Sequence, residues 1–93
     1  MPAYYVYIIE CSDKNGKKTY YTGSTQDLKK RFDLHESGKG AKYTKGKKLK
    51  LVYYETLLSN SDARRREIEI KKLPLEQKRN IVAGVKDENQ KSA

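Results

Sequence analysis

The sequence predicts a small α+β domain in which a three-stranded antiparallel sheet is flanked by helices, in the order β-β-α-β-α-α. Three segments rich in aromatic and β-branched residues predict the strands. Capping residues between and after these segments predict the helices. At 93 residues the chain suits one domain with a thin core. We expect this domain to occupy residues 1–84, and residues 85–93 to form a disordered polar tail.

The first two expected strands surround a strong turn signal. Residues 4–11 (YYVYIIEC) and 18–22 (KTYYT) are the strand segments, and Asn15-Gly16 between them is typical of a hairpin turn. A two-residue turn at this dipeptide would pair Glu10 with Tyr21. An odd-length loop or a bulge would shift the pairing by one residue and reverse the face on which Tyr21 lies.

The remaining elements follow from cap and stop signals. Residues 49–55 (LKLVYYE) predict the third strand. The first helix is expected to start with an N-cap at Thr25 and Asp27 in its first turn. The second is expected to start with a loose capping box of Ser59 and Asp62. The third is expected to have Pro74 in its first turn. The expected helix ends lie near Ser37, Leu73 and Ala83, with Gly23 ending the second strand and Gly38 and Gly40 stopping the first helix.

Charge favours a polyanionic partner. The formal net charge is +9, from 21 Lys and Arg against 12 Asp and Glu. This excess fits nucleic acid first and an anionic membrane surface second, although many small domains are basic merely to stay soluble. No apolar run approaches the ~20 residues of a transmembrane helix, so we expect no membrane partner. Residues 39–50 hold six Lys and no acid around Tyr43, which predicts a mobile basic loop with room for a short helical turn.

Cysteine usage and the N-terminus indicate the compartment. Cys11 is the single cysteine, which excludes an internal disulfide and a cysteine-based zinc site. It lies in an apolar run, so we expect a buried, inert thiol. The N-terminus has no basic segment followed by an apolar one, so we expect no secretory signal. We therefore expect a cytoplasmic protein.

Two polar residues border the buried face of the first expected helix. On a helical wheel Leu28 and Phe32 form the apolar stripe, His35 falls between and below them, and Arg31 lies on the shoulder. The simplest interpretation is a core-edge histidine with satisfied hydrogen bonds and a solvated arginine. The alternative is that both side chains line a functional site.

The second expected helix has a carboxylate in a comparable place. Ala63 and Ile70 define its apolar stripe, and Glu67 lies within about 40° of both. A glutamate seldom faces a core unless it is paired or binds a metal. An ion pair to Arg31, or a different stripe that includes Ile68, would also explain the pattern.

Together these side chains offer what phosphodiester hydrolysis needs. A carboxylate can hold one Mg²⁺, which polarises the phosphate and stabilises the leaving oxygen. An arginine can stabilise the transition-state charge. A tyrosine or histidine with a suitably shifted pKa can handle the proton of the attacking water. One His and one inward Glu are too few ligands for a typical two-metal site.

The spacing of these residues resembles a known family. Tyr5-Val6-Tyr7 followed by Tyr21-Thr22-Gly23 resembles the two-part signature of the GIY-YIG nuclease domain, with Tyr5 in place of the first glycine. Arg31, His35 and Glu67 match the family's spacing for its arginine, its histidine or tyrosine, and its metal-binding glutamate. YYTGST and GKGAKYT occur in this order in the small stand-alone bacterial branch. The resemblance covers roughly residues 4–83.

The resemblance implies a metal-dependent endonuclease that hydrolyses phosphodiester bonds in DNA, with branched or damaged DNA in repair or recombination as candidate substrates, and one Mg²⁺ or Mn²⁺ ion. It implies that Tyr7 and Tyr21 orient or deprotonate the attacking water. It also implies that Arg31 holds the scissile phosphate and that His35 assists proton transfer or phosphate binding. Glu67 would ligate the metal. Which tyrosine is the base stays open. Because both tyrosines must share one sheet face, we predict that Ile9 pairs with Tyr21 and Tyr7 with Gly23.

Nucleic-acid contacts are expected from the basic loop and from the glycine that lets the backbone pass close to the site. The candidates are Gly23, Lys39, Lys42, Tyr43, Lys45, Lys47 and Lys48. DNA is expected before RNA, and a protein partner would supply target specificity.

A non-catalytic nucleic-acid-binding module is the main alternative, and a domain that binds an acidic protein is a third. Glu67 separates the first two, because a binding module needs no inward carboxylate. Asn80 is the candidate for a late family asparagine, although a surface position explains it as well.

Overall fold

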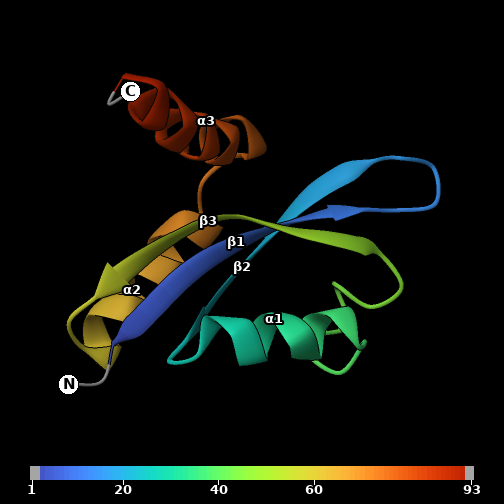
Figure 1. The fold of residues 1–93 in the computed structure, drawn as a ribbon, viewed down its shortest axis with the longest axis horizontal. Coiled ribbons are helices and arrows are strands. Elements are labelled where there is room, and N and C mark those ends of the chain that lie inside the picture. Colours follow the sequence, from blue (N-terminus) through green and yellow to red (C-terminus); the bar gives the residue numbers. More distant parts are fainter. Residues whose placement is uncertain (1–2, 92–93) are drawn as a thin grey trace.

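A central antiparallel sheet separates two helical layers (Figure 1). The computed structural model describes the backbone of residues 3–91 and the side chains of residues 3–84. Strands β1 (Tyr4–Ser12), β2 (Lys18–Thr25) and β3 (Lys48–Leu57) lie in the order β2-β1-β3. Helix α1 (Leu28–Glu36) covers one face, and α2 (Asn60–Lys71) and α3 (Leu75–Lys91) cover the other. The α+β class and the element order are confirmed.

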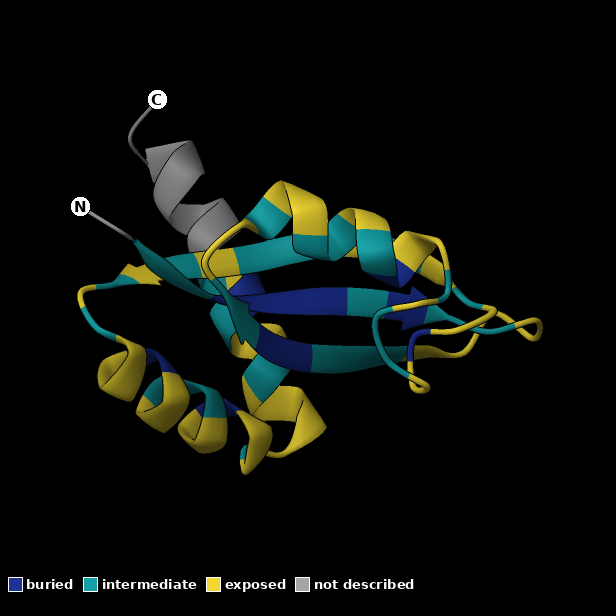
Figure 2. Cartoon of the chain, turned by 90° about the horizontal axis from the view of Figure 1, so that it is seen from below, coloured by how far each residue is buried: buried dark blue, intermediate teal, exposed yellow. Residues whose placement is uncertain are grey.

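Alternation along β1 divides the core into two clusters. The cluster beneath α2 and α3 comprises Val6, Ile8, Ala63, Ile70 and Val82. The cluster beneath α1 comprises Tyr7, Ile9 and Cys11, with Leu28 and Phe32 partly buried against it. Figure 2 shows the buried positions concentrated on the central strand between the helices. The thiol of Cys11 is buried and free, as expected.

The hairpin has the register that places Tyr7 and Tyr21 on the same face of the sheet. Ile9 pairs with Tyr21 and Tyr7 with Gly23, as predicted, so the two-residue turn is wrong. Because Ser12 pairs with Lys18, the connecting loop covers residues 13–17 and has an odd length.

The side chain of Asp13 organises this loop. Its carboxylate accepts hydrogen bonds from the backbone N–H groups of Asn15 and Lys17, both at 2.9 Å. Gly16 adopts a φ of +81°, a conformation that favours glycine. Asn15-Gly16 therefore marks a turn, but inside a longer loop.

Two predicted boundaries around β2 are wrong. β2 continues through Gly23 to Thr25, because its pairing with β1 extends to Tyr5. The N-cap of α1 is Asp27, whose carboxylate accepts from the N–H of Lys30 at 3.0 Å. The Thr25 hydroxyl instead accepts from the N–H of Asp27 at 3.1 Å.

Of the later boundaries, the start of α2 agrees with the prediction and the end of α3 does not. Ser59 caps α2 as predicted, accepting from the N–H of Asp62 at 3.1 Å. The backbone of α3 continues to Lys91, beyond the end expected near Ala83. Of the tail expected over residues 85–93, the last two residues lie outside the described residues, and the limits of the domain stay a prediction. No helix in the described part of the chain is long and apolar enough to cross a bilayer.

Candidate active site

Tyr7 and His35 form a buried hydrogen bond between β1 and α1. The Tyr7 hydroxyl lies 2.9 Å from Nε2 of His35, and the two residues are only 2% and 1% exposed. Burial raises the pKa of Tyr7, while the neighbouring Arg31 guanidinium acts to lower it. Burial, with a smaller contribution from the Arg31 charge, lowers the pKa of His35. The imidazole is therefore neutral near pH 7 and can accept a proton at one nitrogen.

Tyr21 joins this pair from β2. Its ring centroid lies 5.1 Å from that of His35 and 6.5 Å from that of Tyr7. The ring of Tyr43 stacks on Tyr21 at 6.1 Å and 27°. Nζ of Lys47 lies 3.9 Å from the Tyr43 centroid, a cation–π contact. The Tyr43 ring of the basic loop thus packs on Tyr21 and contacts Lys47.

Two glycines let the rings of Tyr7 and His35 pack against the backbone. A Cβ at Gly23 would meet the Tyr7 hydroxyl and would lie 2.7 Å from Cζ of Tyr7. A Cβ at Gly40 would meet the His35 ring and would lie 2.8 Å from its Cγ. Neither position can carry a side chain without a shift of its neighbour. The close approach expected at Gly23 is to the Tyr7 ring, whereas Gly40 was expected only to stop a helix.

Arg31 lies beside Tyr7 and His35 and forms no ion pair within the described part of the chain. Its Nε is buried and has no hydrogen-bond partner among the described residues, and no described carboxylate pairs with it. The side chain lines a cavity of about 190 Å³ together with Thr25, Asp27, Lys30 and Leu34. The alternative of an ion pair between Arg31 and Glu67 is wrong, because Glu67 pairs with Lys71, and the arginine expected to be solvated is half-buried. The arrangement leaves a cationic group that can receive an anion.

Glu67 approaches β2 from the opposite face of the sheet. Its Oε1 accepts a hydrogen bond from the Ser24 hydroxyl at 2.6 Å, and its Oε2 pairs with Nζ of Lys71 at 2.7 Å. Burial acts to raise the pKa of Glu67, but Lys71, Ser24 and the charge of Arg64 together lower it below its usual value. Ala63 and Ile70 are buried whereas Ile68 is 52% exposed, so the predicted stripe is correct. Glu67 is thus an inward-leaning, ionised carboxylate.

Tyr7 and Glu67 contact neighbouring residues of β2 from opposite faces of the sheet. Tyr7 packs over Gly23 on the α1 side, and the next residue of β2, Ser24, holds Glu67 on the α2 side. The Glu67 charge contributes to the raised pKa of Tyr7, so the two side chains lie within electrostatic reach. We call this arrangement the β2-edge site, comprising Tyr7, Tyr21, Gly23, Arg31, His35 and Glu67.

Comparison with known proteins shows the family of this chain. The family model described as the GIY-YIG catalytic domain matches residues 3–80. This chain belongs to the GIY-YIG family. A UPF0213 protein of Clostridium perfringens is 43% identical over 88 residues, which cover 91% of this chain and 90% of that protein. A UPF0213 protein of Syntrophus aciditrophicus is 48% identical over 80 residues, covering 84% and 87%.

A solved structure agrees with this assignment. The solution NMR structure of a UPF0213 protein from Bacillus halodurans is 40% identical to this chain, with a TM-score of 0.51. The match covers 87% of this chain and 83% of that one. The GIY-YIG fold therefore extends over most of the chain, as the resemblance implied.

The carboxylate of this GIY-YIG domain suits a hard divalent cation. Among the described residues there is no group of three or more His, Cys, Asp or Glu that could hold a metal. Mg²⁺ keeps several waters and is commonly held by one or two carboxylates plus phosphate oxygens, so a single ionised Glu67 fits it, as it fits Mn²⁺. Lys71 already places a cation beside Oε2, which shows that positive charge is accommodated there. A structural zinc ion, which takes four protein ligands, does not fit.

Several contacts of the GIY-YIG domain were not predicted. Thr44 and Gly40 lie in the quoted GKGAKYT segment, yet neither was assigned a role beside His35. The position of Ser24 on the α2 side of β2, next to Gly23, could have been anticipated from strand alternation. The candidates Lys39, Lys42, Lys45 and Lys48 are exposed on the basic loop, and Asn80 is exposed on α3.

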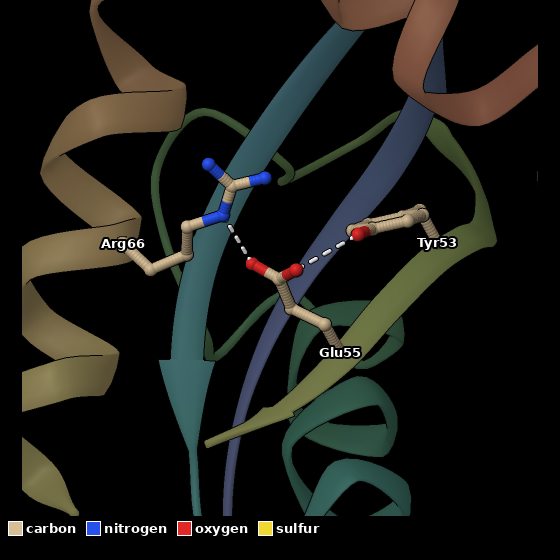
Figure 3. Close-up of polar contacts among 3 residues, drawn as sticks. All are labelled: Tyr53, Glu55 and Arg66. Atoms are coloured by element: carbon tan, nitrogen blue, oxygen red, sulfur yellow. Dashed lines mark hydrogen bonds and ion pairs between the residues drawn. The ribbon is translucent and has the colours of Figure 1, made fainter. Parts of the chain in front are cut away.

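A further polar group fixes α2 to the sheet. The Glu55 carboxylate on β3 accepts from the Tyr53 hydroxyl at 2.9 Å and from Nε of Arg66 on α2 (Figure 3). Burial and the hydrogen bond to Glu55 raise the pKa of Tyr53. Arg66 directly precedes Glu67, so this ion pair fixes the turn of α2 that carries the site carboxylate.

Stability should depend on pH through His35. Its pKa in the folded chain lies below the ordinary 6.5, so the unfolded chain binds a proton there that the folded chain does not. The free energy of unfolding should therefore fall as pH decreases below about 6.5, by at most about 1.4 kcal/mol per pH unit. Denaturant unfolding at several pH values measures this slope. His35→Gln should flatten it above the range in which carboxylates titrate, and an equally steep slope in the variant would contradict the assignment to His35.

Proposed function

We propose that this chain is a divalent-metal-dependent endonuclease that hydrolyses phosphodiester bonds in DNA, with branched or damaged DNA in repair or recombination as its substrates. Membership of the GIY-YIG family supports the nuclease class. The observation that carries the proposal is the β2-edge site, where a neutral Tyr7–His35 pair, an Arg31 with no ion-pair partner among the described residues and an ionised Glu67 lie along one strand. The buried free thiol of Cys11 suits a reducing, cytoplasmic setting.

Tyr7 is the tyrosine that we propose as the base. The attacking water gives its proton to the Tyr7 oxygen while the Tyr7 proton passes to Nε2 of His35, across the 2.9 Å hydrogen bond. Burial disfavours a free phenolate, so the neutral imidazole is what makes this transfer feasible. Tyr21 orients the water and packs against His35.

Arg31 binds the phosphate directly, whereas Glu67 would act on it through a bound cation. Arg31, with Lys30 in the same cavity, holds the scissile phosphate and stabilises the charge that develops on its oxygens. Glu67 would hold one Mg²⁺ or Mn²⁺ in place of the ammonium group of Lys71 at Oε2. When bound, the ion polarises the phosphate and stabilises the leaving oxygen.

A nucleic-acid-binding module without catalysis is the second candidate. The exposed Lys-rich loop and the net charge of +9 favour it, because phosphate contacts alone supply sequence-independent affinity. DNA is the expected ligand before RNA, and a protein partner would select the target. Both candidates require the loop, so loop variants cannot separate them.

Loop lysines should set the salt dependence of DNA binding. Replacing Lys42 and Lys45 by glutamine should flatten the slope of log affinity against log salt by up to about 1.8, since each duplex phosphate contact contributes about 0.9. Fluorescence anisotropy at several salt concentrations measures the slope. Lys14→Gln with Lys17→Gln, the same charge change on the β1–β2 loop, is the matched control. An unchanged slope in the first variant would argue against phosphate contacts at the loop.

Cleavage of labelled substrates tests the catalytic proposal. Plasmid, single strand, flap, four-way junction and RNA should be incubated with Mg²⁺ or Mn²⁺, and in parallel with a chelator. We expect metal-dependent cutting of DNA, strongest on one of the branched forms. Tight binding of every substrate without cutting under any of these conditions would favour the binding module.

A further inference from the structure

Thr44 contacts the imidazole nitrogen of His35 that Tyr7 does not use. Thr44 is 1% exposed, although it lies in the otherwise exposed turn over residues 42–46. Its Oγ1 is 3.0 Å from Nδ1 of His35 and donates to the carbonyl oxygen of Ala41 at 3.1 Å. Both ring nitrogens of His35 therefore have a hydrogen-bonding partner.

Counting the protons of Tyr7, His35 and Thr44 favours one direction for each hydrogen bond. A threonine hydroxyl has one proton, and here it goes to the Ala41 carbonyl. The same oxygen can then only accept from His35, so Nδ1 must carry the imidazole proton. In the neutral ring Nε2 is left without a proton and accepts from the Tyr7 hydroxyl.

The opposite assignment leaves groups without partners. If Thr44 donated to His35, the Ala41 carbonyl would lose its hydrogen bond and Nε2 would donate to the Tyr7 oxygen. The proton of Tyr7 would then need another acceptor. Arg31, the side chain that lowers the pKa of Tyr7 through a hydrogen bond, has only donors and cannot accept this proton. Buried polar groups without partners are costly, so the first assignment is favoured.

We propose that Thr44 is a positioning residue that holds His35 in the Nδ1–H tautomer, so that Nε2 faces Tyr7 as a proton acceptor. Its catalytic consequence rests on the proposed function, because only a reaction that uses the Tyr7 proton depends on the tautomer. Gly40 also contributes to the position of His35, since a side chain there would displace the His35 ring from Thr44. A fixed tautomer has this effect because the imidazole can act as base only through its unprotonated nitrogen.

Nitrogen NMR of the imidazole tests the tautomer without any activity. The chain contains a single histidine, so a long-range ¹H–¹⁵N spectrum shows one imidazole. The wild-type spectrum should show a protonated Nδ1 and an unprotonated Nε2, and it needs no variant. A wild-type chain in the Nε2–H tautomer would overturn the proposal.

Two variants test whether Thr44 is the cause. Thr44→Ser keeps the hydroxyl and should keep the wild-type tautomer. Thr44→Val keeps the shape but removes the hydroxyl, and it should shift His35 to the Nε2–H tautomer, with Thr44→Ala as a second variant if the valine chain does not fold. An amide spectrum checks the fold of each. An unchanged tautomer in a folded Thr44→Val or Thr44→Ala chain would also overturn the proposal.

Single-turnover cleavage then tests the consequence. Loss of the Thr44 hydroxyl should lower the cleavage rate about 10- to 100-fold, the usual effect of removing a group that orients a functional histidine, while DNA affinity stays unchanged. Thr44→Ser should restore most of the rate. If the wild-type chain cuts no substrate, the proposed function fails while the NMR result still decides the tautomer. An altered tautomer with a full cleavage rate would overturn the catalytic role.

Discussion

Glu67→Gln is expected to lower the rate of metal-dependent DNA cleavage by about 10³-fold. The amide keeps the shape of the side chain and can still accept from Ser24, but it lacks the negative charge that holds a divalent cation. The magnitude corresponds to losing one strong stabiliser of transition-state charge. Single-turnover cleavage in Mg²⁺ measures it, and DNA affinity measured in a chelator should not fall.

Glu69→Gln is the matched control for this change. Glu69 lies on the same helix, is exposed, and carries the same charge. Its replacement should leave the cleavage rate unchanged. Stability should change little in Glu67→Gln, because the ion pair that it loses involves a half-exposed Lys71 and such pairs contribute little. Equal losses of rate in both variants would mean that net charge matters rather than a metal at Glu67.

Gly23→Ala is expected to impair both stability and cleavage. The new methyl group would occupy the place of the Tyr7 hydroxyl, and neither the β2 backbone nor the buried Tyr7 ring can move freely. We expect a cost of about 1–3 kcal/mol in the free energy of unfolding, the usual range for overpacking a core. Cleavage should fall with it, because the Tyr7 oxygen must leave its position beside His35.

Denaturant unfolding and cleavage of the same Gly23→Ala preparation measure these two effects. Gly84→Ala is the control, since a Cβ at Gly84 would meet nothing within 4 Å. Within helix α3 this change should increase stability by up to about 1 kcal/mol and leave cleavage unaltered. A Gly23→Ala chain as stable and as active as the wild type would contradict the packing of Tyr7 over Gly23.

The fold could be predicted from the sequence because local patterns and element order agree. The strand composition, the Ser59 cap and the apolar stripe of α2 all correspond to the structure. The boundaries near Gly23 and Thr25 could not be read locally, because sheet pairing with β1 extends the strand past the glycine. The cap of α1 is then Asp27, which accepts from the N–H of Lys30, while Thr25 accepts from the N–H of Asp27 just before the helix.

The candidate site was predictable only as a set of residue types at a given spacing. Helical periodicity placed Glu67 inward, but it could not show that α2 lies on the opposite face of the sheet from Tyr7 and Tyr21. Nor could it show that Lys71 forms the ion pair with Glu67. Thr44 follows His35 across an irregular loop, where no periodicity relates one side chain to another. Buried polar partners of this kind emerge only once the chain packs.

Manganese-induced broadening of NMR signals tests most directly whether the two sides of β2 form one metal-dependent centre. Mn²⁺ added with bound DNA should broaden the amide signals of Gly23, Ser24 and Glu67 first and the His35 imidazole signals next. In Glu67→Gln this broadening should disappear. Broadening centred elsewhere, or unchanged in the variant, would contradict a metal site at the β2 edge.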